Sequence, residues 1–528
     1  MKSGDVTIRI SAATAICPSP TPNFRLALVV LSVGVASHFM LYLDSVMDNL
    51  LPAARPFLMT VYKNKEEADI AWEVMVSSRI YGLAFGCFIS IYFSKLHGRK
   101  YPVVLGTALD LIGILLTLLT VHIRLGMVAA TVGRFINGCG QGIVQTAGTV
   151  MLAELPPHHG RGLALATLTV WACLGELAGM VISLEEILGN PSSWHIAMGI
   201  PLILLVPAFY ILISAPENKR YHPPVYKEDD SKKALLVIQK AVYTDENGNR
   251  KKYEENDDAP IDPDQSTIGF ARERFKNGQF VRPLLLGLFV QSFVHLDDWL
   301  WISYSTHIFG KFGMTMGTAQ RASLFMSLPQ AFISLGLLSC FEDFTRRSLL
   351  LLPTLFSVFI GILAILAVNF GKVLAGMPVA STLAILAAMD LSAAAVSGES
   401  AYAIVPELFL PDDKILGTAI VGIAQNVFGG VLTAVLLTAV NKAGTTLVLI
   451  PFIVTNTVYV VVNYLYLPET SKKTAHEVSE NFSKDLPGKQ LFETLRNTFQ
   501  LLTLQVIVVI LTFRTGLQVY WGLANYFT

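Results

Sequence analysis

The turn "AELPPHHGRG" (residues 153–162) returns in altered form as "PELFLPDDKILG" (406–417), and this repetition decides how the chain is organised. Two further pairs of charged segments keep the same order: "SKLHGRK" (94–100) with "EDFTRR" (342–347), and "APENKR" (215–220) with "LPETSKK" (467–473). The two copies of each pair lie about 250 residues apart, and three such pairs in order indicate a duplicated unit. The chain is therefore predicted to contain two copies of one structural unit.

Between these charged segments the chain is apolar over lengths that suit a lipid bilayer. Hydrophobic residues make up 53% of the 528 residues and charged residues 15%, whereas a soluble chain carries about a quarter charged residues. About 20 apolar residues cross a bilayer core of about 30 Å as a helix. Runs of that length predict about twelve spans: 24–45, 74–94, 101–121, 125–148, 162–183, 196–214, 284–305, 322–341, 349–369, 382–406, 416–440 and 446–466. The predicted fold class is an all-α membrane protein with two six-helix repeats.

The distribution of positive charge predicts the orientation in the membrane. Lys and Arg gather in the connections "SKLHGRK", "HHGRG", "FTRRS" and "SKKTAHE" and in segment 215–282. The positive-inside rule places these parts and both termini in the cytoplasm. We expect a multi-pass integral protein of the plasma membrane. The formal net charge is zero, which argues against a nucleic-acid partner because phosphate binding needs a basic face.

The same features divide the chain into five parts. We expect a cytoplasmic tail (1–23), an N-terminal six-helix bundle (24–221), a charged linker (222–280), a C-terminal six-helix bundle (281–466) and a second tail (467–528). The stretch "DENGNRKKYEENDDAPIDPDQ" of the linker is too charged to bury a core, so it is predicted to be disordered. Residues 499–513 are apolar but short, which favours an interfacial helix over a thirteenth span.

The loop and span motifs resemble those of the sugar-porter branch of the major facilitator superfamily, in particular the facilitative glucose-transporter group. "VGRFINGCGQGI" (132–143) resembles its GRFIxGxxxGL, "LAELPPHHGRGLA" (152–164) its YxxEIxPxxxRGAL, and "LPETSKKTAHEV" (467–478) its closing LPETKGRTxEEI. The similarity extends over about residues 24–480 in normal order. The resemblance implies a major facilitator fold and alternating-access transport of a small polar solute, a sugar or sugar-like compound.

The resemblance also implies a cytoplasmic gate made of charge pairs at helix ends. Such pairs are individually weak but together bias one conformation over another. The residues that match the family's motifs, and that we predict to form this gate, are Arg99, Arg134, Glu154, Arg161, Glu217, Arg220, Glu342, Arg346, Arg347, Glu407, Lys414 and Glu469.

The substrate-site motifs depart from those of the family. Where the family carries QQLSGIN before YYST, an alignment on "YST" (304–306) leaves Phe293, Val294 and Trp299 at the amide positions. In the tenth span GPGPIPW is replaced by "VSGESAY" (396–402). The candidate substrate-binding residues are Asp44, Thr169, His295, Asp297, Asp298, Trp299, Tyr402, Gln425 and Asn426.

Several acids lie within predicted spans, where a carboxylate is costly unless it is protonated, paired or hydrated. Asp44 falls within one residue of the Asp that proton-coupled sugar porters carry in FGYDxGV. In "QSFVHLDDWLWISYST" (291–306), adjacent Asp297 and Asp298 point about 100° apart on a helix. We therefore expect at least one to face the central cavity, where with His295 it binds a cationic group or carries a proton. The alternative is solvated, inert surface at the exterior end.

Three functional hypotheses remain open at this point. The first is a secondary transporter for a small polar solute, and the second is a proton-coupled or organic-cation carrier. The third is a non-transporting nutrient sensor with the same fold. The sequence contains no nucleophile elbow, phosphate-binding glycine loop or metal-ligand cluster, so we expect no enzyme, cofactor or metal. The expected partners are a small-molecule solute, protons and the lipid bilayer.

Overall fold

The computed structural model describes most of the predicted bundles and little of the linker and tails. The described residues are 24–62, 64–122, 125–155, 161–215, 274–275, 278–339, 341–371, 378–410, 413–471, 473 and 477–478. The charged stretch of the predicted linker and the predicted interfacial helix 499–513 lie outside these ranges. The fold is therefore built from two sets of helices, one on each side of the linker.

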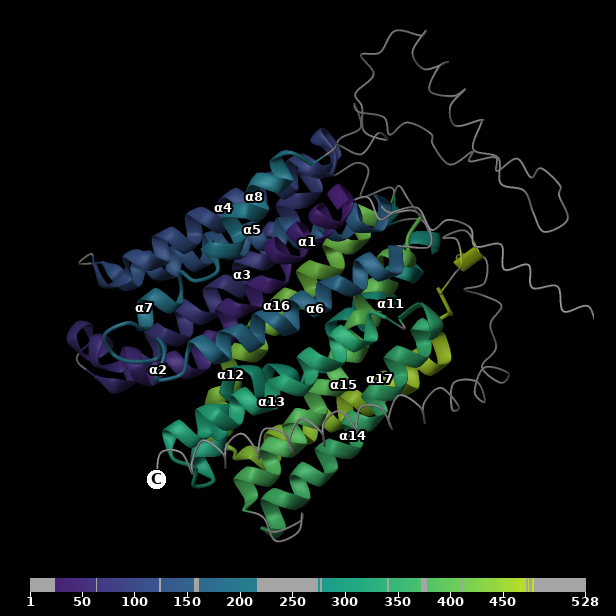
Figure 1. The fold of residues 1–528 in the computed structure, drawn as a ribbon. Helices are drawn as coiled ribbons and strands as arrows, with labels where there is room; N and C mark the ends of the chain where they lie inside the picture. The colour runs from purple at the N-terminus through teal and green to yellow at the C-terminus, as the bar shows by residue number, and fades with distance from the viewer. Residues whose placement is uncertain are drawn as a thin grey trace, which may run out of the picture.

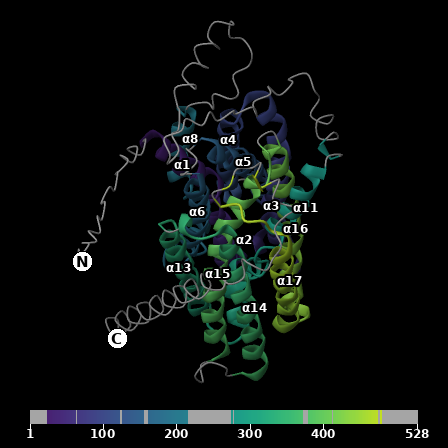
Figure 2. The ribbon, with the colours of Figure 1, turned by 90° about the vertical axis from the view of Figure 1, so that its right-hand side faces the viewer.

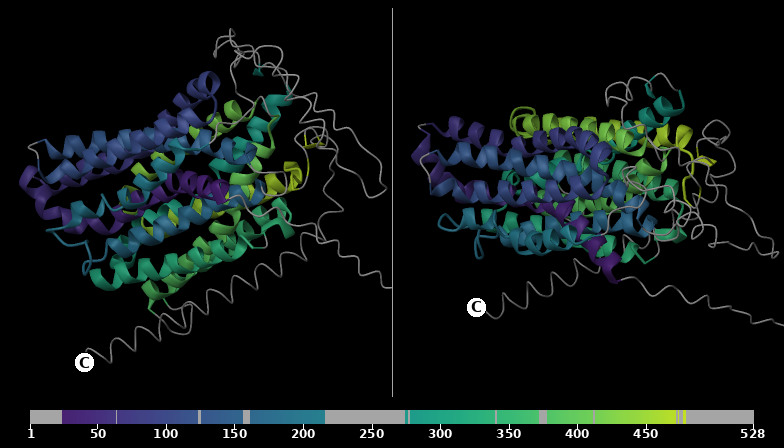
Figure 3. Two further views of the ribbon diagram at one scale, coloured as in Figure 1. Left: turned by 45° about the horizontal axis from the view of Figure 1, so that its top comes forward. Right: turned by 90° about the horizontal axis from the view of Figure 1, so that it is seen from above.

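The described elements are helices that run side by side along one direction (Figures 1 and 3). In chain order they are α1 Phe24–Ser37, η1 Phe39–Leu41, α2 Tyr42–Val61, α3 Lys65–His97, α4 Lys100–Leu118, η2 Leu119–Val121, α5 Gly126–Glu154, α6 Arg161–Ile182, α7 Trp194–Ala197, α8 Leu202–Ile213, α11 Gly278–Ser292, α12 Asp298–Lys311, α13 Met316–Leu337, η5 Phe341–Asp343, α14 Arg346–Phe370, α15 Val379–Glu407, α16 Lys414–Lys442 and α17 Thr445–Tyr466. Within the described ranges, nine helical stretches are long and apolar enough to cross a membrane.

Three of the passes are broken rather than continuous. The described helices make twelve successive passes when α1–η1–α2, α7–α8 and α11–α12 are each counted as one. The first span was predicted to end at residue 45, because polar residues such as Asn49 and Arg55 interrupt the apolar run. These residues do not end the helix, and α2 continues to Val61. The predicted seventh span is likewise two helices, α11 and α12, separated by residues 293–297.

The two halves meet along specific helix pairs. Helix α3 packs against α16, α6 against α13 and α15, and α2 against α12. In Figures 1 and 2 the helices α13, α14 and α15 lie apart from α4, α5 and α8, while α16 runs beside α3. Apolar cores lie within each half: one gathers mainly residues of α1–α8, and two others gather residues of α11–α17.

The halves also touch where α12 meets α2 and where α13 meets the loop after α6, opposite the charged gate segments. The Thr306 hydroxyl donates to the Asn49 side-chain oxygen at 2.8 Å. Arg321 donates to Glu186 at 2.5 Å. This hydrogen bond lowers the pKa of the Glu186 carboxylate, because the guanidinium stabilises the charged form. These contacts join the halves on the predicted exterior side.

Within the N-terminal half, α3 and α5 approach closely through glycines spaced four residues apart. A Cβ atom on Gly138 would lie 2.0 Å from the Arg79 backbone oxygen, and one on Gly142 would lie 2.1 Å from the Leu83 oxygen. On α3, Gly82 and Gly86 face the α5 backbone in the same way. Such small-xxx-small patterns let membrane helices pack backbone to backbone. This close packing fixes α3, which carries Arg79, against α5, which carries Arg134.

We expect Gly138→Ala to lower the thermal unfolding midpoint of the purified protein, since the new methyl group must displace the α3 backbone. Overpacking of this kind costs about 1–3 kcal/mol. The matched control is Gly310→Ala on α12, where a Cβ meets nothing within 4 Å and the alanine favours the helix. Equal midpoints for the two variants would contradict the close approach of α3 and α5.

Candidate functional site

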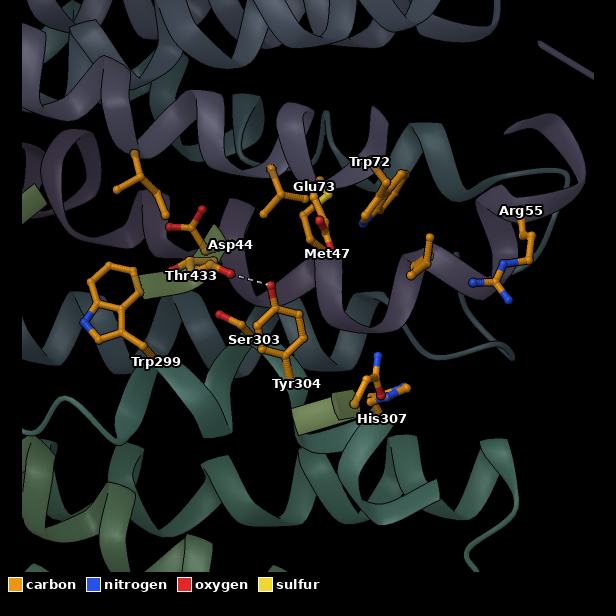
Figure 4. A pocket seen from close by; sticks show the side chains of 14 residues that line it. Asp44, Met47, Arg55, Trp72, Glu73, Trp299, Ser303, Tyr304, His307 and Thr433 are labelled. Carbon is orange, nitrogen blue, oxygen red and sulfur yellow. Dashed lines mark hydrogen bonds between the residues drawn. The ribbon is translucent and has the colours of Figure 1, made fainter. Parts of the chain in front are cut away.

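A cavity of about 260 Å³ lies between the two halves, enclosed by α2 and α3 on one side and α12 and α16 on the other. Figure 4 shows Asp44 and Trp299 toward one end of the cavity and Arg55 and His307 toward the other. The lining residues are Asp44, Met47, Leu51, Arg55, Trp72, Glu73, Val76, Ile80, Trp299, Ser303, Tyr304, His307, Thr433 and Asn441. Two of the predicted substrate-binding residues, Asp44 and Trp299, line it.

Tyr304 spans two of the cavity walls. Its hydroxyl donates to the Thr433 backbone oxygen at 2.9 Å, which ties α12 to α16 (Figure 4). Nearer the predicted exterior end of the cavity, His307 hydrogen-bonds the Asn441 side-chain oxygen at 2.9 Å. Hydroxyl, imidazole and amide groups therefore line the cavity together with Trp72 and Trp299. Cavities that bind small polar ligands combine apolar walls with a few placed polar groups in this way.

Two buried arginines hold the Asp44 carboxylate at the inner end of the cavity. Arg79 of α3 contacts Asp44 directly, and Arg134 of α5 lies 3.4 Å from it. Both guanidinium groups are nearly inaccessible, whereas the Asp44 side chain keeps 13% of its surface exposed. Asp44 is thus an intramembrane carboxylate that is paired with positive charge and reachable from the cavity.

Arg79 is also the centre of a buried polar network. It donates to the Asn137 side-chain oxygen at 3.0 Å, to the Met40 backbone oxygen at 2.6 Å and to the Gln141 side-chain oxygen. Asn137 in turn donates to Asp110 of α4 at 3.1 Å. Two arginines and two aspartates therefore share one network, so its formal charges sum to zero when both acids are ionised.

The prediction that Arg134 belongs to the cytoplasmic gate is wrong. Arg134 lies in the first third of α5, twenty positions from Glu154 at the end of the same helix. That separation is about 30 Å at 1.5 Å per residue. Its guanidinium donates to the backbone oxygens of Met75 and Leu43 at 3.1 and 3.0 Å, in addition to its ion pair with Asp44. Arg134 belongs to the Asp44 network.

Other predicted gate residues do meet at the cytoplasmic ends of helices. Arg99 pairs with Glu154 at 3.4 Å. In the C-terminal half, Glu469 accepts from the backbone N–H groups of Arg346 and Arg347 at 3.0 and 3.2 Å.

For the remaining predicted gate residues the structure describes fewer contacts. Thr470 donates to Glu407 at 2.6 Å, and Lys414 begins α16. Glu217 and Arg220, and the side chains of Arg161 and Glu342, lie outside the described part of the chain.

A second polar cluster lies where α11 breaks before α12. His295, Asp297 and Asp298 each offer a ligand atom, and these atoms lie within 4.8 Å of one another. Asp297 accepts from Ser357 at 3.1 Å and from Asn456 at 3.2 Å. Neither aspartate lines the 260 Å³ cavity, so the expectation that one faces it is not met in this structure.

Asp390 of α15 joins this cluster. It accepts from the Trp301 indole N–H at 3.0 Å and from Ser357, which also donates to Asp297. The cluster therefore links α12, α14, α15 and α17 inside the C-terminal half.

The last four predicted substrate residues lie toward the cytoplasmic side of the interface between the halves. Tyr402 and Gln425 line a small cavity of about 30 Å³ together with Gln145 and Gln291. Asn426 donates to the Gly422 backbone oxygen at 2.8 Å, and Thr169 is buried on α6. The structure brings Tyr402 and Gln425 together but places Asp44 and Trp299 in the larger cavity.

Sequence reasoning missed Gln291 and Arg79. Gln291 is an amide at the start of segment 291–306, and it lines the small cavity with Tyr402 and Gln425. An amide near the end of an apolar run was the signal that could have found it. Arg79 was visible as an arginine within an apolar span, which is costly unless it is paired.

Comparison with known proteins identifies the family. The sequence model described as "Sugar (and other) transporter" matches residues 26–482. Among curated proteins, the mouse facilitated glucose transporter member 9 is 27% identical over 211 residues, which are 38% of each chain. The pig facilitated glucose transporter member 2 is 25% identical over 295 residues, 53% of this chain and 52% of the relative. These alignments thus cover about half of the relatives or less.

Solved structures establish the fold. The proton:xylose symporter XylE bound to 6-bromo-6-deoxy-D-glucose superposes with a TM-score of 0.68 at 15% identity, covering 87% of this chain and 99% of that one. An inward-open form of XylE from E. coli gives a TM-score of 0.60. The predicted all-α major facilitator fold and the resemblance to sugar porters are confirmed. Because the family model matches nearly the whole chain, the protein belongs to the sugar (and other) transporter family.

Proposed function

We propose that the chain is a secondary transporter that moves a sugar or sugar-like solute by alternating access between its two halves. The observation that carries this proposal is the cavity between α2, α3, α12 and α16, which has polar groups on both sides and a paired carboxylate at its inner end. Sugar hydroxyls need such convergent donors and acceptors, because each unpaired buried polar group costs about 1–3 kcal/mol.

Proton coupling is favoured over simple facilitated diffusion. Asp44 is partly exposed to the cavity and is held by Arg79 and Arg134. Proton uptake by Asp44 would remove its attraction to both guanidinium groups and so change how α2 is held against α3 and α5. A similar fold belongs to a protein named as a proton:xylose symporter. A membrane carboxylate of this kind is the usual carrier of a coupling proton.

The test is uptake of labelled glucose, xylose and inositol into vesicles that contain the purified full-length chain. We expect at least one of these solutes to accumulate, and to accumulate further when the outside is made acidic. Binding without accumulation would support the nutrient-sensor alternative and contradict the proposal. Solute uptake that follows the solute gradient and does not respond to external pH would support a transporter without proton coupling.

The gate residues supply an independent prediction about the transport cycle. Glu154→Gln removes the charge that pairs with Arg99. We expect uptake to fall about fivefold, since the loss of an ion pair worth about 1 kcal/mol shifts a two-state balance by that factor. Glu407→Gln, which weakens the bond from Thr470, should act in the same direction.

Glu185→Gln is the matched control, because Glu185 is an exposed acid of the loop between α6 and α7. It should retain the original uptake rate. Surface labelling must show equal amounts of all three variants in the membrane. Uptake by Glu154→Gln and Glu407→Gln at the level of the control would contradict a role for these residues in the gate.

We also propose that the protein resides in the plasma membrane with both termini in the cytoplasm. The support is the positive charge of the connections on the side of "SKLHGRK", "HHGRG" and "FTRRS". Epitope tags placed at each terminus should react with antibody only after cells are permeabilised. Reaction of a tag with antibody at intact cells would show that the tagged terminus lies outside the cell and would contradict the proposed orientation.

A further inference from the structure

The break between α11 and α12 brings together three side chains that can bind a metal ion. His295, Asp297 and Asp298 belong to the five-residue connection and to the first position of α12. One ligand atom from each lies within 4.8 Å of the other two. His295 has a φ of +41°, the one positive φ of a non-glycine residue in the described chain. The unwound backbone is therefore what turns the imidazole toward the two carboxylates.

The surroundings of this cluster carry excess negative charge. Asp297 and Asp390 are 4% and 3% exposed, and Ser357 bridges them. Asp298 also interacts electrostatically with both acids and with Glu176 of α6. Within the described residues, no Lys or Arg forms an ion pair with Asp297, Asp298 or Asp390. This contrasts with Asp44, which contacts two arginines. Asp298 is half-buried, but Asp297 and Asp390 are buried, and buried carboxylates without a basic partner need another cation or protons.

Several acceptor atoms at the cluster have no hydrogen-bond partner. They are Nδ1 of His295, Oδ1 of Asp298 and Oδ1 of Asn456. His295 and Asn456 are 2% and 1% exposed, so bulk water does not reach them. The Asn456 amide group donates to both oxygens of Asp297, so it contributes donors to the cluster. Buried polar atoms in native proteins nearly always have a partner, and their convergence indicates a ligand.

The neighbouring hydroxyl and amide groups already orient the ligands. The Nε2 atom of His295 lies 3.3 Å from the Thr354 hydroxyl, which leaves Nδ1 for a metal. Ser357 and Asn456 hold the Asp297 carboxylate. Metal sites commonly fix their imidazole and carboxylate ligands through hydrogen bonds of this kind.

We propose that His295, Asp297 and Asp298 bind a divalent metal ion. One imidazole nitrogen with two carboxylates suits Zn²⁺ or Mn²⁺ better than Na⁺ or Mg²⁺, which prefer oxygen ligands alone. A divalent ion also offsets two of the three carboxylate charges, whereas Na⁺ offsets one. Ligands around Zn²⁺ at about 2.0–2.1 Å lie about 3.3 Å apart, so binding requires the cluster to contract.

A metal ion at this position would act on the transport cavity. Helix α12 begins at Asp298 and carries Trp299, Ser303, Tyr304 and His307 into the cavity wall. Binding would fix the start of α12 relative to α14 and α17, which hold the other ligand contacts. Occupancy of this site is independent of which solute the chain carries, so it is measured without a transport assay.

The experiment uses the purified full-length chain, stripped with a chelator and then titrated separately with Zn²⁺, Mn²⁺, Mg²⁺ and Na⁺. We expect Zn²⁺ or Mn²⁺ to bind at about one ion per chain and to raise the unfolding midpoint by a few degrees at saturation. Elemental analysis after gel filtration gives the stoichiometry. Absence of a saturable divalent ion overturns the proposal, and so does stabilisation by Na⁺ alone.

Substitutions at the proposed ligands test where the ion binds. Asp298→Asn and His295→Asn should each weaken binding at least about tenfold, and asparagine tolerates the positive φ at position 295. The matched control is the double variant His122→Gln and His195→Gln, which removes a pair of histidines whose rings lie 5.7 Å apart near the exterior surface. Binding that survives both site variants but is lost in the control would place the ion at that surface pair and overturn the proposal. If a site variant fails to fold, the control variant decides: one ion per chain that remains in it supports the proposal, and loss of the ion from it overturns the proposal.

Discussion

Asp44→Asn should abolish accumulation of solute driven by a proton gradient, while exchange of solute at equal concentrations continues. Asparagine keeps the shape and one acceptor oxygen of Asp44 but cannot change its charge during the cycle. The Arg79 and Arg134 guanidinium groups would then face a neutral partner at all times. Transport would be uncoupled, because the step that senses a proton is removed while the cavity remains.

The measurement is uptake and exchange in vesicles at several external pH values. Other titratable or charged groups near Asp44 include Glu73 and Arg55, which line the cavity, and Asp110, which joins the network through Asn137 of α5. Glu176 of α6 also interacts electrostatically with Asp44. Glu73→Gln and Asp110→Asn should therefore be measured in parallel. Asp343→Asn, an exposed acid of η5, is the control that should not change the pH profile. Acid-stimulated accumulation that persists in Asp44→Asn would exclude Asp44 as the proton carrier.

The sequence predicted the fold because its strongest signals are long and repeated. The apolar runs and the paired charged turns depend only on helix length and loop order, and the described helices follow them closely. Composition alone does not predict the breaks within passes. Residues 293–297 are as apolar as their neighbours except for His295 and Asp297, and composition does not reveal that the backbone unwinds there.

The candidate site was predicted only in part. Asp44 was identified because its position matches a motif, but Arg134 was assigned to the wrong end of its helix because a motif match gives order along the chain and not depth in the membrane. His295 and Asp297, two positions apart, would point to opposite sides of a continuous helix or nearly so. Only the unwound connection lets them converge, so their spacing along a helix does not by itself predict a shared metal site.

Arg79→Met should destabilise the protein more than any other substitution considered. The guanidinium group donates hydrogen bonds to four acceptors at once: the side chains of Asp44, Asn137 and Gln141 and the Met40 backbone oxygen. Methionine is of similar length and apolar, so the change removes the charge and the donors while it keeps much of the packing. Breaking a buried ion pair by removing one partner costs about 3–5 kcal/mol, mainly because the remaining charge is left uncompensated. Arg134 lies 3.4 Å from Asp44 and compensates it only in part.

The unfolding midpoint of the purified variant in detergent measures this loss, with Arg282→Met on exposed α11 surface as the control that should stay near the original value. Arg79→Lys should fall between them, because lysine supplies the charge but not the several donors. The double variant Asp44→Asn/Arg79→Met distinguishes the ion pair from simple loss of packing. If the pair is responsible, neutralising Asp44 relieves part of the penalty, and the double variant is less unstable than the sum of the single changes. Additive losses would mean that Arg79 stabilises the helices without acting through Asp44.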